Sequence, residues 1–172
     1  MRGSTELGER IAPQEYATLL NRFYRVATEV LIRHDAIIDK LIGDEVMALF
    51  IPGICGPKYR LRAAEAALAL RAAVGFDGQG EPWMPLGAAV NSGLTYVGNV
   101  GAEGVVDFTA LGDAVNTAAR LASSAAAGEV LLSEEVYAEL ADRYPDSEAR
   151  TLMLRGKEAP FAVRVIKSSD GT

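Results

Sequence analysis

The chain has 172 residues, of which 49% are hydrophobic and 23% charged, and its net charge is −6 at pH 7. These values predict one globular domain with an ordinary core. The acidic balance, without a stripe rich in Lys and Arg, excludes nucleic acid as an expected partner. No apolar run reaches the ~18 residues of a membrane span, so no membrane partner is expected for this segment. One Cys and one His exclude an internal disulfide and a zinc cluster. With no signal peptide visible, we expect a cytoplasmic location.

Apolar residues at helical spacing alternate along the chain with short runs typical of strands. In chain order, the predicted elements are a short helical start within residues 1–12, a helix over Pro13–His34, a hairpin of strands Ala36–Ile42 and Glu45–Phe50, a helix over Lys58–Val74, strands over Leu86–Asn91, Thr95–Val100 and Val105–Leu111, a helix over Asp113–Ser123, a strand over Glu129–Ser133, a helix from Glu134 to about Arg143, and a strand over Phe161–Lys167. This order predicts an α+β architecture in which helices cover a mainly antiparallel sheet. The predicted domain covers residues 1–167, and a disordered tail is expected over 168–172.

The helix predicted from Asp113 carries the most informative pair of polar side chains. Asn116 and Arg120 are four residues apart, so they project from the same face of the helix. Asp113 is expected to be the N-cap. A neutral amide beside a fixed cation suits a sugar hydroxyl and a phosphate, although both residues could also simply cap and solvate a helix.

The predicted hairpin near residue 43 carries a second candidate site. Gly43 and Asp44 form its turn, and a carboxylate at a hairpin tip is accessible to an ion. Phosphoryl chemistry on nucleotides uses carboxylates to hold Mg²⁺. Lys40 lies in the strand that leads to the tip and could face a base or a phosphate. A Gly-Asp turn is also common turn chemistry without a ligand, and Lys40 could be a solvated strand residue.

Taken together, these motifs are much more specific than each one alone. The segments that carry the pattern are Lys40–Asp44, Leu86–Gly93, Gly98–Gly101, Phe108–Leu121 and Leu154–Lys157. In order and spacing, from Arg2 to about Ile166, the chain resembles the class III adenylate/guanylate cyclase catalytic domain. The helix that reads Val-Asn-x-Ala-x-Arg-Leu discriminates this family from diguanylate cyclases and polymerase palms, which also place acidic residues on a hairpin.

The resemblance implies a fold and a role for each matching residue. The fold would be α+β, with a ferredoxin-like, antiparallel-rich sheet and flanking helices. Asp44 would be one of two aspartates that bind Mg²⁺ or Mn²⁺. Lys40 would hydrogen-bond a ring nitrogen of the purine, and Thr109 would read its exocyclic group. Asn116 would orient the ribose. Arg120 would stabilise charge on the α-phosphate as the ribose 3′-oxygen attacks it.

The resemblance also implies a substrate and an assembly. A Lys with a hydroxyl residue at the base-reading positions is similar to adenine-selective members, so we expect ATP as the substrate and cyclic AMP with pyrophosphate as the products. In this family each site lies between two subunits. This chain carries both sets of residues, which implies a symmetric homodimer with two shared sites.

The chain departs from the family at its start. The first metal aspartate of the family lies at the end of the first strand, in a segment like Asp-x-Arg-Gly-Ser-Thr. Here Arg2-Gly-Ser-Thr5 is present, and Met1 stands at the position of x. We therefore expect the first, central strand to be missing, its neighbours to have unpaired backbone groups, and this polypeptide to have little or no activity.

Three alternatives stay open from the sequence. Thr109 suits a strand for ordinary reasons, and Asp107 is a competing acceptor near it. The chain could be a non-catalytic module that dimerises or senses nucleotides. It could also be a guanylate cyclase.

Overall fold

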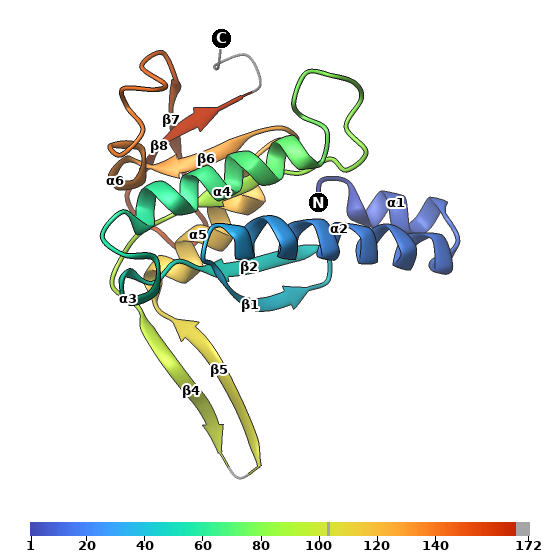
Figure 1. The fold of residues 1–172 in the computed structure, drawn as a ribbon, viewed down its shortest axis with the longest axis horizontal. Coiled ribbons are helices and arrows are strands. Elements are labelled where there is room, and N and C mark those ends of the chain that lie inside the picture. Colours follow the sequence, from blue (N-terminus) through green and yellow to red (C-terminus); the bar gives the residue numbers. More distant parts are fainter. Residues whose placement is uncertain (103, 168–172) are drawn as a thin grey trace.

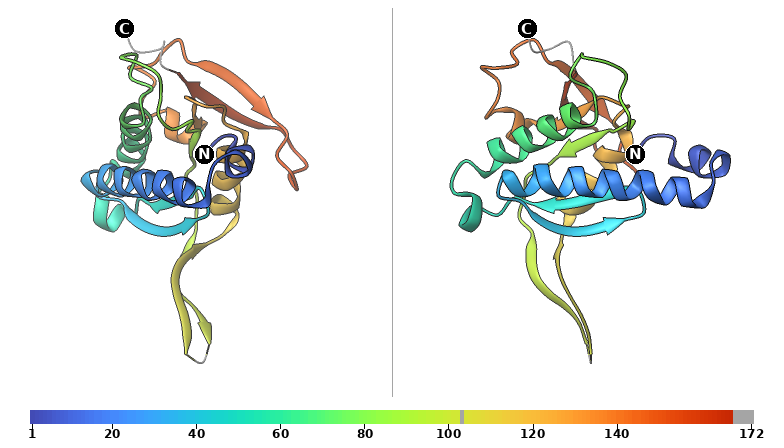
Figure 2. Two further views of the ribbon diagram at one scale, coloured as in Figure 1. Left: turned by 90° about the vertical axis from the view of Figure 1, so that its right-hand side faces the viewer. Right: turned by 45° about the vertical axis from the view of Figure 1, so that its right-hand side comes forward.

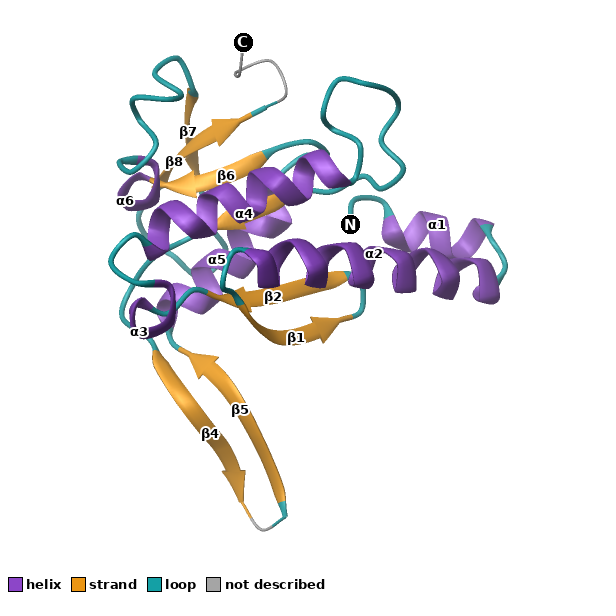
Figure 3. Cartoon of the chain, viewed as in Figure 1, coloured by secondary structure: helices purple, strands orange, loops and turns teal. Residues whose placement is uncertain are grey.

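The computed structural model describes residues 1–102 and 104–167 and confirms the predicted α+β architecture (Figures 1 and 3). The helices are α1 (Ser4–Arg10), α2 (Pro13–Arg33), α3 (Pro52–Cys55), α4 (Tyr59–Ala73), α5 (Asp113–Ser124) and α6 (Glu134–Tyr137). The strands are β1 (Ile37–Ile42), β2 (Glu45–Leu49), β3 (Ala88–Val90), β4 (Tyr96–Ala102), β5 (Val105–Leu111), β6 (Val130–Ser133), β7 (Glu148–Leu152) and β8 (Phe161–Ile166). None of the described helices is both long and apolar enough to cross a membrane. The predicted tail, 168–172, lies outside the described residues.

The strands form three separate sheets within the described part of the chain. Strands β3, β6, β8 and β7 make a four-stranded sheet in that order, while β1–β2 and β4–β5 are two-stranded hairpins. All pairs are antiparallel except β3 with β6. Both β2 and β3 are edge strands, and residues of both line a cleft of about 710 Å³. The backbone edges beside this cleft have no neighbouring strand among the described residues, as expected for a sheet that lacks a central strand.

Alternate side chains of β6 pack into the core on opposite faces of the four-stranded sheet. Val130 and Leu132 pack with α4 and α6, while Leu131 points to the other face and packs with Ala125, just after α5. All three β6 residues are completely buried. Figure 2 shows α4 on one side of this sheet and α5 on the other. The sheet is therefore the middle layer of a three-layer arrangement.

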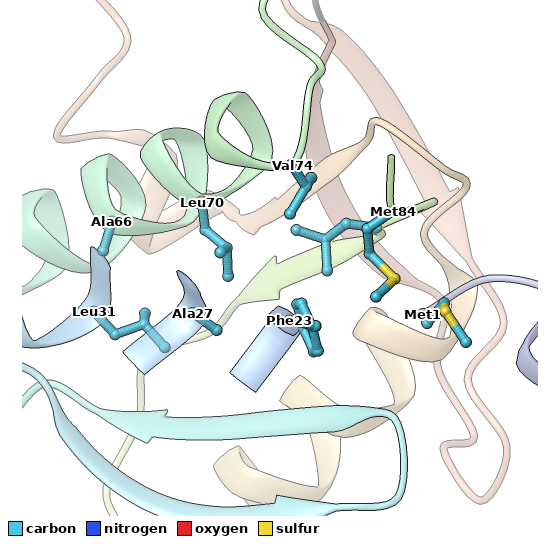
Figure 4. Packing of buried hydrophobic residues seen from close by; sticks show 9 residues of the cluster. Met1, Phe23, Ala27, Leu31, Ala66, Leu70, Val74 and Met84 are labelled. Atoms are coloured by element: carbon cyan, nitrogen blue, oxygen red, sulfur yellow. The ribbon is translucent and has the colours of Figure 1, made fainter. Parts of the chain in front are cut away.

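A second core lies between α2 and α4. Phe23 and Ala27 of α2 meet Leu70 of α4, with Met84 closing the cluster (Figure 4). Alanines on α4 let the two helices approach closely, and the hairpin β1–β2 packs against the opposite side of α2. The predicted helix over Pro13–His34 is confirmed, because its apolar residues recur on one face.

The hairpin β4–β5 extends away from the rest of the molecule (Figures 1 and 2). Its register runs from Tyr96 opposite Leu111 to Ala102 opposite Val105. The sequence predicted both strands, but not their pairing. Large apolar side chains on this hairpin are more than half exposed: Tyr96, Val106 and Phe108. An exposed apolar surface of this kind is typical of a contact with another chain.

Four local predictions were incomplete or wrong. Strand β7 was missed, since its five residues alternate charged and small side chains and give no apolar signal. The short helix α3 lies in a predicted loop, and α6 ends at Tyr137 where turns follow. The N-cap of α5 is Gly112 and makes no side-chain cap, because Asp113 is the first helical residue and pairs with Lys157 instead.

Candidate functional site

Asp44 lies with Gly43 in the tight turn between β1 and β2. Gly43 takes a left-handed conformation, with φ 57°, which lets the chain reverse. The Tyr24 hydroxyl donates a hydrogen bond to the Gly43 carbonyl and ties the turn to α2. The Met1 nitrogen lies 3.0 Å from the Asp44 carbonyl oxygen and 3.0 Å from its Oδ2. Burial raises the pKa of the Asp44 carboxyl, but hydrogen bonds from the Met1 nitrogen and Ser4 outweigh it and hold the pKa below its ordinary value.

The surroundings of Asp44 fit a metal ion only in part. Its side chain is 30% exposed, and the residue lines the cleft between β2 and β3. Mg²⁺ is often held by one or two carboxylates together with substrate phosphates. Among the described residues, however, there is no group of three or more His, Cys, Asp or Glu that could hold a metal by itself. A metal ion at Asp44 would therefore need its other ligands from elsewhere.

Lys40 and Thr109, which are far apart in the sequence, are brought to one place by β1 and β5. The Lys40 ammonium forms an ion pair with Asp107 of β5. The Thr109 hydroxyl donates to Oδ2 of Asp39 over 3.0 Å, and Thr109 is 5% exposed. Asp107 and Thr109 are two apart on β5, so they share one face of that strand. A cationic donor and a hydroxyl thus lie side by side where the two hairpins meet.

Asn116 and Arg120 lie on one face of α5, as predicted. Asn116 is exposed and Arg120 is half-buried. Within residues 1–102 and 104–167, the Arg120 guanidinium forms no ion pair. It lies beside the turn at Gly156, where a Cβ atom, were this residue not glycine, would be 3.5 Å from the Arg120 Nη2 atom. The charge of Arg120 acts on the Asp113 carboxylate without a direct ion pair, which leaves the guanidinium donors for an anionic ligand.

A second cation joins this face of α5 from the turn after β7. Lys157 forms its ion pair with Asp113, at the start of α5. The hydrogen bond from Lys157 is the main reason that the pKa of the Asp113 carboxyl is low, and the charge of Arg120 adds to it. Lys157 and Arg120 therefore act on the same small region of surface.

The structure does not join Asp44 to the α5 residues. Ala118 and Ala122 line the cleft that Asp44 also lines, whereas Asn116 and Arg120 are absent from that lining. On a helix, positions 116 and 120 point away from 118 and 122. The predicted residues therefore fall into separate groups: Asp44 at the cleft, Lys40 with Thr109 between the hairpins, and Asn116 with Arg120 on another face of α5.

Sequence reasoning missed two residues in these groups. Asp39 contacts Thr109, although strand alternation places it on the face opposite Lys40, so the pattern gave no signal. Lys157 was noticed only as part of the family pattern over Leu154–Lys157, and it lies just after a turn beside α5. The only signal in the sequence was a basic residue, Lys157, next to Gly156. This signal does not predict a contact with Asp113.

Comparison with known proteins gives a consistent result. The sequence model of the family described as "Adenylate and Guanylate cyclase catalytic domain" matches residues 1–165. The adenylyl cyclase CyaB from P. aeruginosa is similar in structure, with a TM-score of 0.79 and 31% identity over 98% of this chain and 91% of that chain. The guanylyl cyclase Cya2 has a TM-score of 0.81 at 23% identity, over 96% and 86% of the two chains, which shows likeness of fold.

Curated relatives are longer than this chain. An uncharacterised protein of Mycobacterium tuberculosis is 34% identical over 169 residues, which cover 95% of this chain and 31% of the relative. Adenylate cyclase 1 of Rhizobium meliloti is 30% identical over 122 residues, or 68% of this chain and 18% of the relative. The chain thus spans less than a third of the length of these relatives.

Proposed function

The chain belongs to the family of adenylate and guanylate cyclase catalytic domains, and from this premise we propose that it converts ATP to 3′,5′-cyclic AMP and pyrophosphate. In this reaction the ribose 3′-oxygen attacks the α-phosphorus and the bond to the pyrophosphate breaks. Similarity at about 30% identity to proteins named adenylate or adenylyl cyclase supports ATP. An enzyme that uses ATP acts where ATP is abundant, so a cytoplasmic location belongs to the same proposal.

The pair formed by Lys40 and Thr109 supports adenine as the base. Adenine offers an acceptor at ring nitrogen N1 and a donor at its 6-amino group, whereas guanine carries an acceptor at position 6. The Lys40 ammonium can only donate, and the Thr109 hydroxyl can accept. The two groups are held near one another through their contacts with Asp107 and Asp39. This combination favours ATP over the alternative substrate, GTP.

The observation that carries the proposal is the placement of the Arg120 guanidinium one helical turn from Asn116. Arg stays charged and matches phosphate oxygens with two parallel donors. In the described chain it has no ion-pair partner, although it is half-buried. Asn116 would bind the ribose, Arg120 would stabilise charge at the α-phosphate, and Lys157 adds positive charge beside them. Phosphoryl transfer depends mainly on such positioning and electrostatics.

Asp44 would hold one side of a Mg²⁺ or Mn²⁺ ion that arrives with the triphosphate. Such an ion, when bound, neutralises charge on the phosphate oxygens. The Asp44 side chain is 30% exposed and the residue lines the cleft, so its carboxylate is within reach of such an ion. One carboxylate fits a metal shared with substrate phosphates, and the cleft beside it leaves room for a further ligand.

Completion of the sheet and of the site belongs to the same proposal. A strand between β2 and β3 would pair both free edges, fill the cleft and end near Asp44. Residues 1–167 would then form a cyclase homology domain in which the edges of β2 and β3 leave a place for one further strand. The separation of Asp44 from Arg120 supports a homodimer in which each site takes residues from both subunits. The exposed apolar side chains of β4–β5 offer a surface for that contact.

A second candidate function is a non-catalytic module that binds a nucleotide without converting it. The observation that favours it is that, among the described residues, no group of three or more His, Cys, Asp or Glu could hold a metal ion by itself. Activity of the completed domain separates the two candidates.

The test is cyclic AMP formation with Mn²⁺ by a form of the protein extended before Met1 with a strand that ends in Asp. The extended protein should form cyclic AMP from ATP, and Arg120→Ala should lower kcat about 100-fold or more. Arg143→Ala is the matched control, because Arg143 is an exposed arginine paired with Glu65 on a distant surface, and it should keep full activity. A folded, dimeric extended protein that forms no cyclic nucleotide would exclude the enzyme and leave the binding module.

A further inference from the structure

Two consecutive residues of β1 reach the same face of β5. Asp39 contacts Thr109, and Lys40 contacts Asp107. Consecutive residues of a regular strand point to opposite faces. In β1, however, Ile38 is opposite Ala48 and Lys40 is opposite Met47, so the register shifts at Asp39. This β-bulge redirects the Asp39 side chain toward β5, as bulges commonly do near functional sites.

The contact with Asp39 fixes the direction of the Thr109 hydroxyl. Thr109 Oγ1 lies 3.0 Å from Asp39 Oδ2. A carboxylate has no proton to give, so the hydroxyl donates its only proton to Asp39 and keeps lone pairs for any other partner. Thr109 is 5% exposed, so water offers the hydroxyl little alternative. Toward a ligand, Thr109 is therefore an acceptor.

The second oxygen of the same carboxylate points to the same conclusion. Asp39 Oδ1 is buried and has no hydrogen-bond partner in the described structure. Apart from the Lys40 ammonium, the groups around Thr109 are mainly hydrogen-bond acceptors, so donors are in short supply there. A ligand group that donates hydrogen bonds relieves this shortage of donors, whereas a ligand group that only accepts makes it worse.

We infer that Asp39 is a positioning residue for base selection: it holds Thr109 as an acceptor and so selects purine nucleotides with an amino group at position 6 over those with an oxygen there. This inference rests on the proposed function and explains one part of its substrate choice. Adenine donates from its 6-amino group, whereas hypoxanthine and guanine present an oxygen that would face the lone pairs of Thr109. Such a mismatch at a buried site lowers affinity by about tenfold to a hundredfold.

The test compares the binding of ATP and inosine triphosphate to the dimeric extended protein, since these nucleotides differ at the purine 6-position and its ring-nitrogen proton. Asp39→Asn keeps the shape of the side chain, but its amide can donate to Thr109 and free the hydroxyl proton. We expect the wild-type protein to bind ATP at least about tenfold more tightly than inosine triphosphate. In Asp39→Asn this ratio should fall about tenfold, with tighter binding of inosine triphosphate as part of the change.

The control is Asp35→Asn, the same chemical change in an aspartate that lies away from Thr109. Asp35 pairs with Arg62 and has φ 64°, a conformation that Asn adopts readily. Asp35→Asn should leave the ratio of ATP affinity to inosine triphosphate affinity unchanged. If Asp39→Asn does not fold, Asp39→Ala provides the measurement, because the Thr109 hydroxyl is then free to rotate and the ratio should still fall.

Three outcomes overturn the inference and are distinguishable. If Asp39→Asn binds ATP but keeps the wild-type ratio, Asp39 does not set the direction of the Thr109 hydroxyl, and the proposed function is unaffected. If the wild-type protein binds none of the purine triphosphates, the proposed function fails and the role of Asp39 fails with it. A ratio that falls only because ATP binding weakens, without a gain for inosine triphosphate, would indicate a structural role and also contradict the inference.

Discussion

The four-stranded sheet and the two hairpins are held together by different kinds of contact. In the sheet, Val130, Leu131 and Leu132 are completely buried between helices on both faces. In the hairpins, β1 meets β5 through polar side chains, and Val106 and Phe108 are more than half exposed. The sheet is built on long-range apolar packing. The hairpin β1–β2 also packs on α2, whereas β4–β5 depends on pairing within the hairpin and on a few polar contacts with β1.

This difference separates stability from recognition. Regions with few buried apolar contacts open more readily than a packed core. The candidate base-reading residues, Lys40 and Thr109, lie where the two hairpins meet; Lys40 is partly exposed there, whereas Thr109 is 5% exposed. Substitutions in the sheet should therefore change the free energy of unfolding, while substitutions on the outer surface of the hairpins should change association and leave folding almost intact.

The largest effect on stability is expected from Leu131→Ala. Leu131 is completely buried and packs against Ala125 and Val165. Removing its side chain leaves a cavity in the middle layer and should lower the free energy of unfolding by about 3 kcal/mol. Urea denaturation followed by circular dichroism measures this change.

The matched control for that substitution is Leu94→Ala. Leu94 is fully exposed in the loop before β4, so the same change should alter the free energy of unfolding by less than about 0.5 kcal/mol. Equal effects of the two substitutions would contradict the contrast between the sheet and the hairpin region.

A smaller effect is expected from the buried charge at the start of β6. Glu129 is 6% exposed and accepts two hydrogen bonds from Arg150, at 2.8 and 2.9 Å, and one from the Ala126 backbone at 2.9 Å. The hydrogen bonds from Arg150 hold the pKa of Glu129 at about 2, below its ordinary value of 4.5, although burial opposes them. Because the folded state binds the proton less readily than the unfolded state, this stabilisation is present above pH 4.5 and is lost as the pH falls toward 2.

Glu129→Gln should remove that part of the pH dependence. At pH 7 it should lower the free energy of unfolding by about 2 kcal/mol, since it removes the charge from a buried pair with Arg150. Between pH 4.5 and 2 its stability should fall less steeply than that of the wild-type protein. Denaturation curves at several pH values measure both effects, and Glu139→Gln, at an exposed position after α6, should reproduce the wild-type curve. If the free energy of unfolding of Glu129→Gln fell with pH as steeply as that of the wild-type protein, Glu129 would not be the source of this pH dependence.

The same contrast explains what the sequence could and could not predict. Helix α2 and the hairpin β1–β2 follow from local patterns, namely apolar spacing and a Gly-Asp turn, and both predictions are confirmed. Strand β7 could not be predicted, because its Arg150 is neutralised by Glu129, which is distant in the sequence. Helix α5 and the shared face of Asn116 and Arg120 were also predictable, because helical spacing is a local pattern in the sequence.

The meeting of Lys40 with Thr109 depended on more than local pattern. Only a family resemblance placed these two residues in one site, since 69 positions separate them in the sequence. The bulge at Asp39 had no signal in the sequence, because it depends on the register of β1 against β2. A register shift is a property of two paired strands, and a strand read alone obeys strict alternation.

The smallest effect on stability is expected from Phe108→Ser. Phe108 is 53% exposed and adjacent to Thr109 on β5, so strand alternation points it away from the face that holds Asp107 and Thr109. Its replacement should change the free energy of unfolding by less than about 0.5 kcal/mol.

In a homodimer that uses the β4–β5 hairpin, the same replacement removes a large apolar contact and should weaken self-association at least about tenfold. Sedimentation velocity over a range of concentrations measures this, with Met153→Ser, which is 70% exposed outside the hairpin, as the matched control. If Phe108→Ser and Met153→Ser associate alike, the apolar surface of the hairpin is not the contact between subunits, and the separation of stability from recognition loses its support at this end of the molecule.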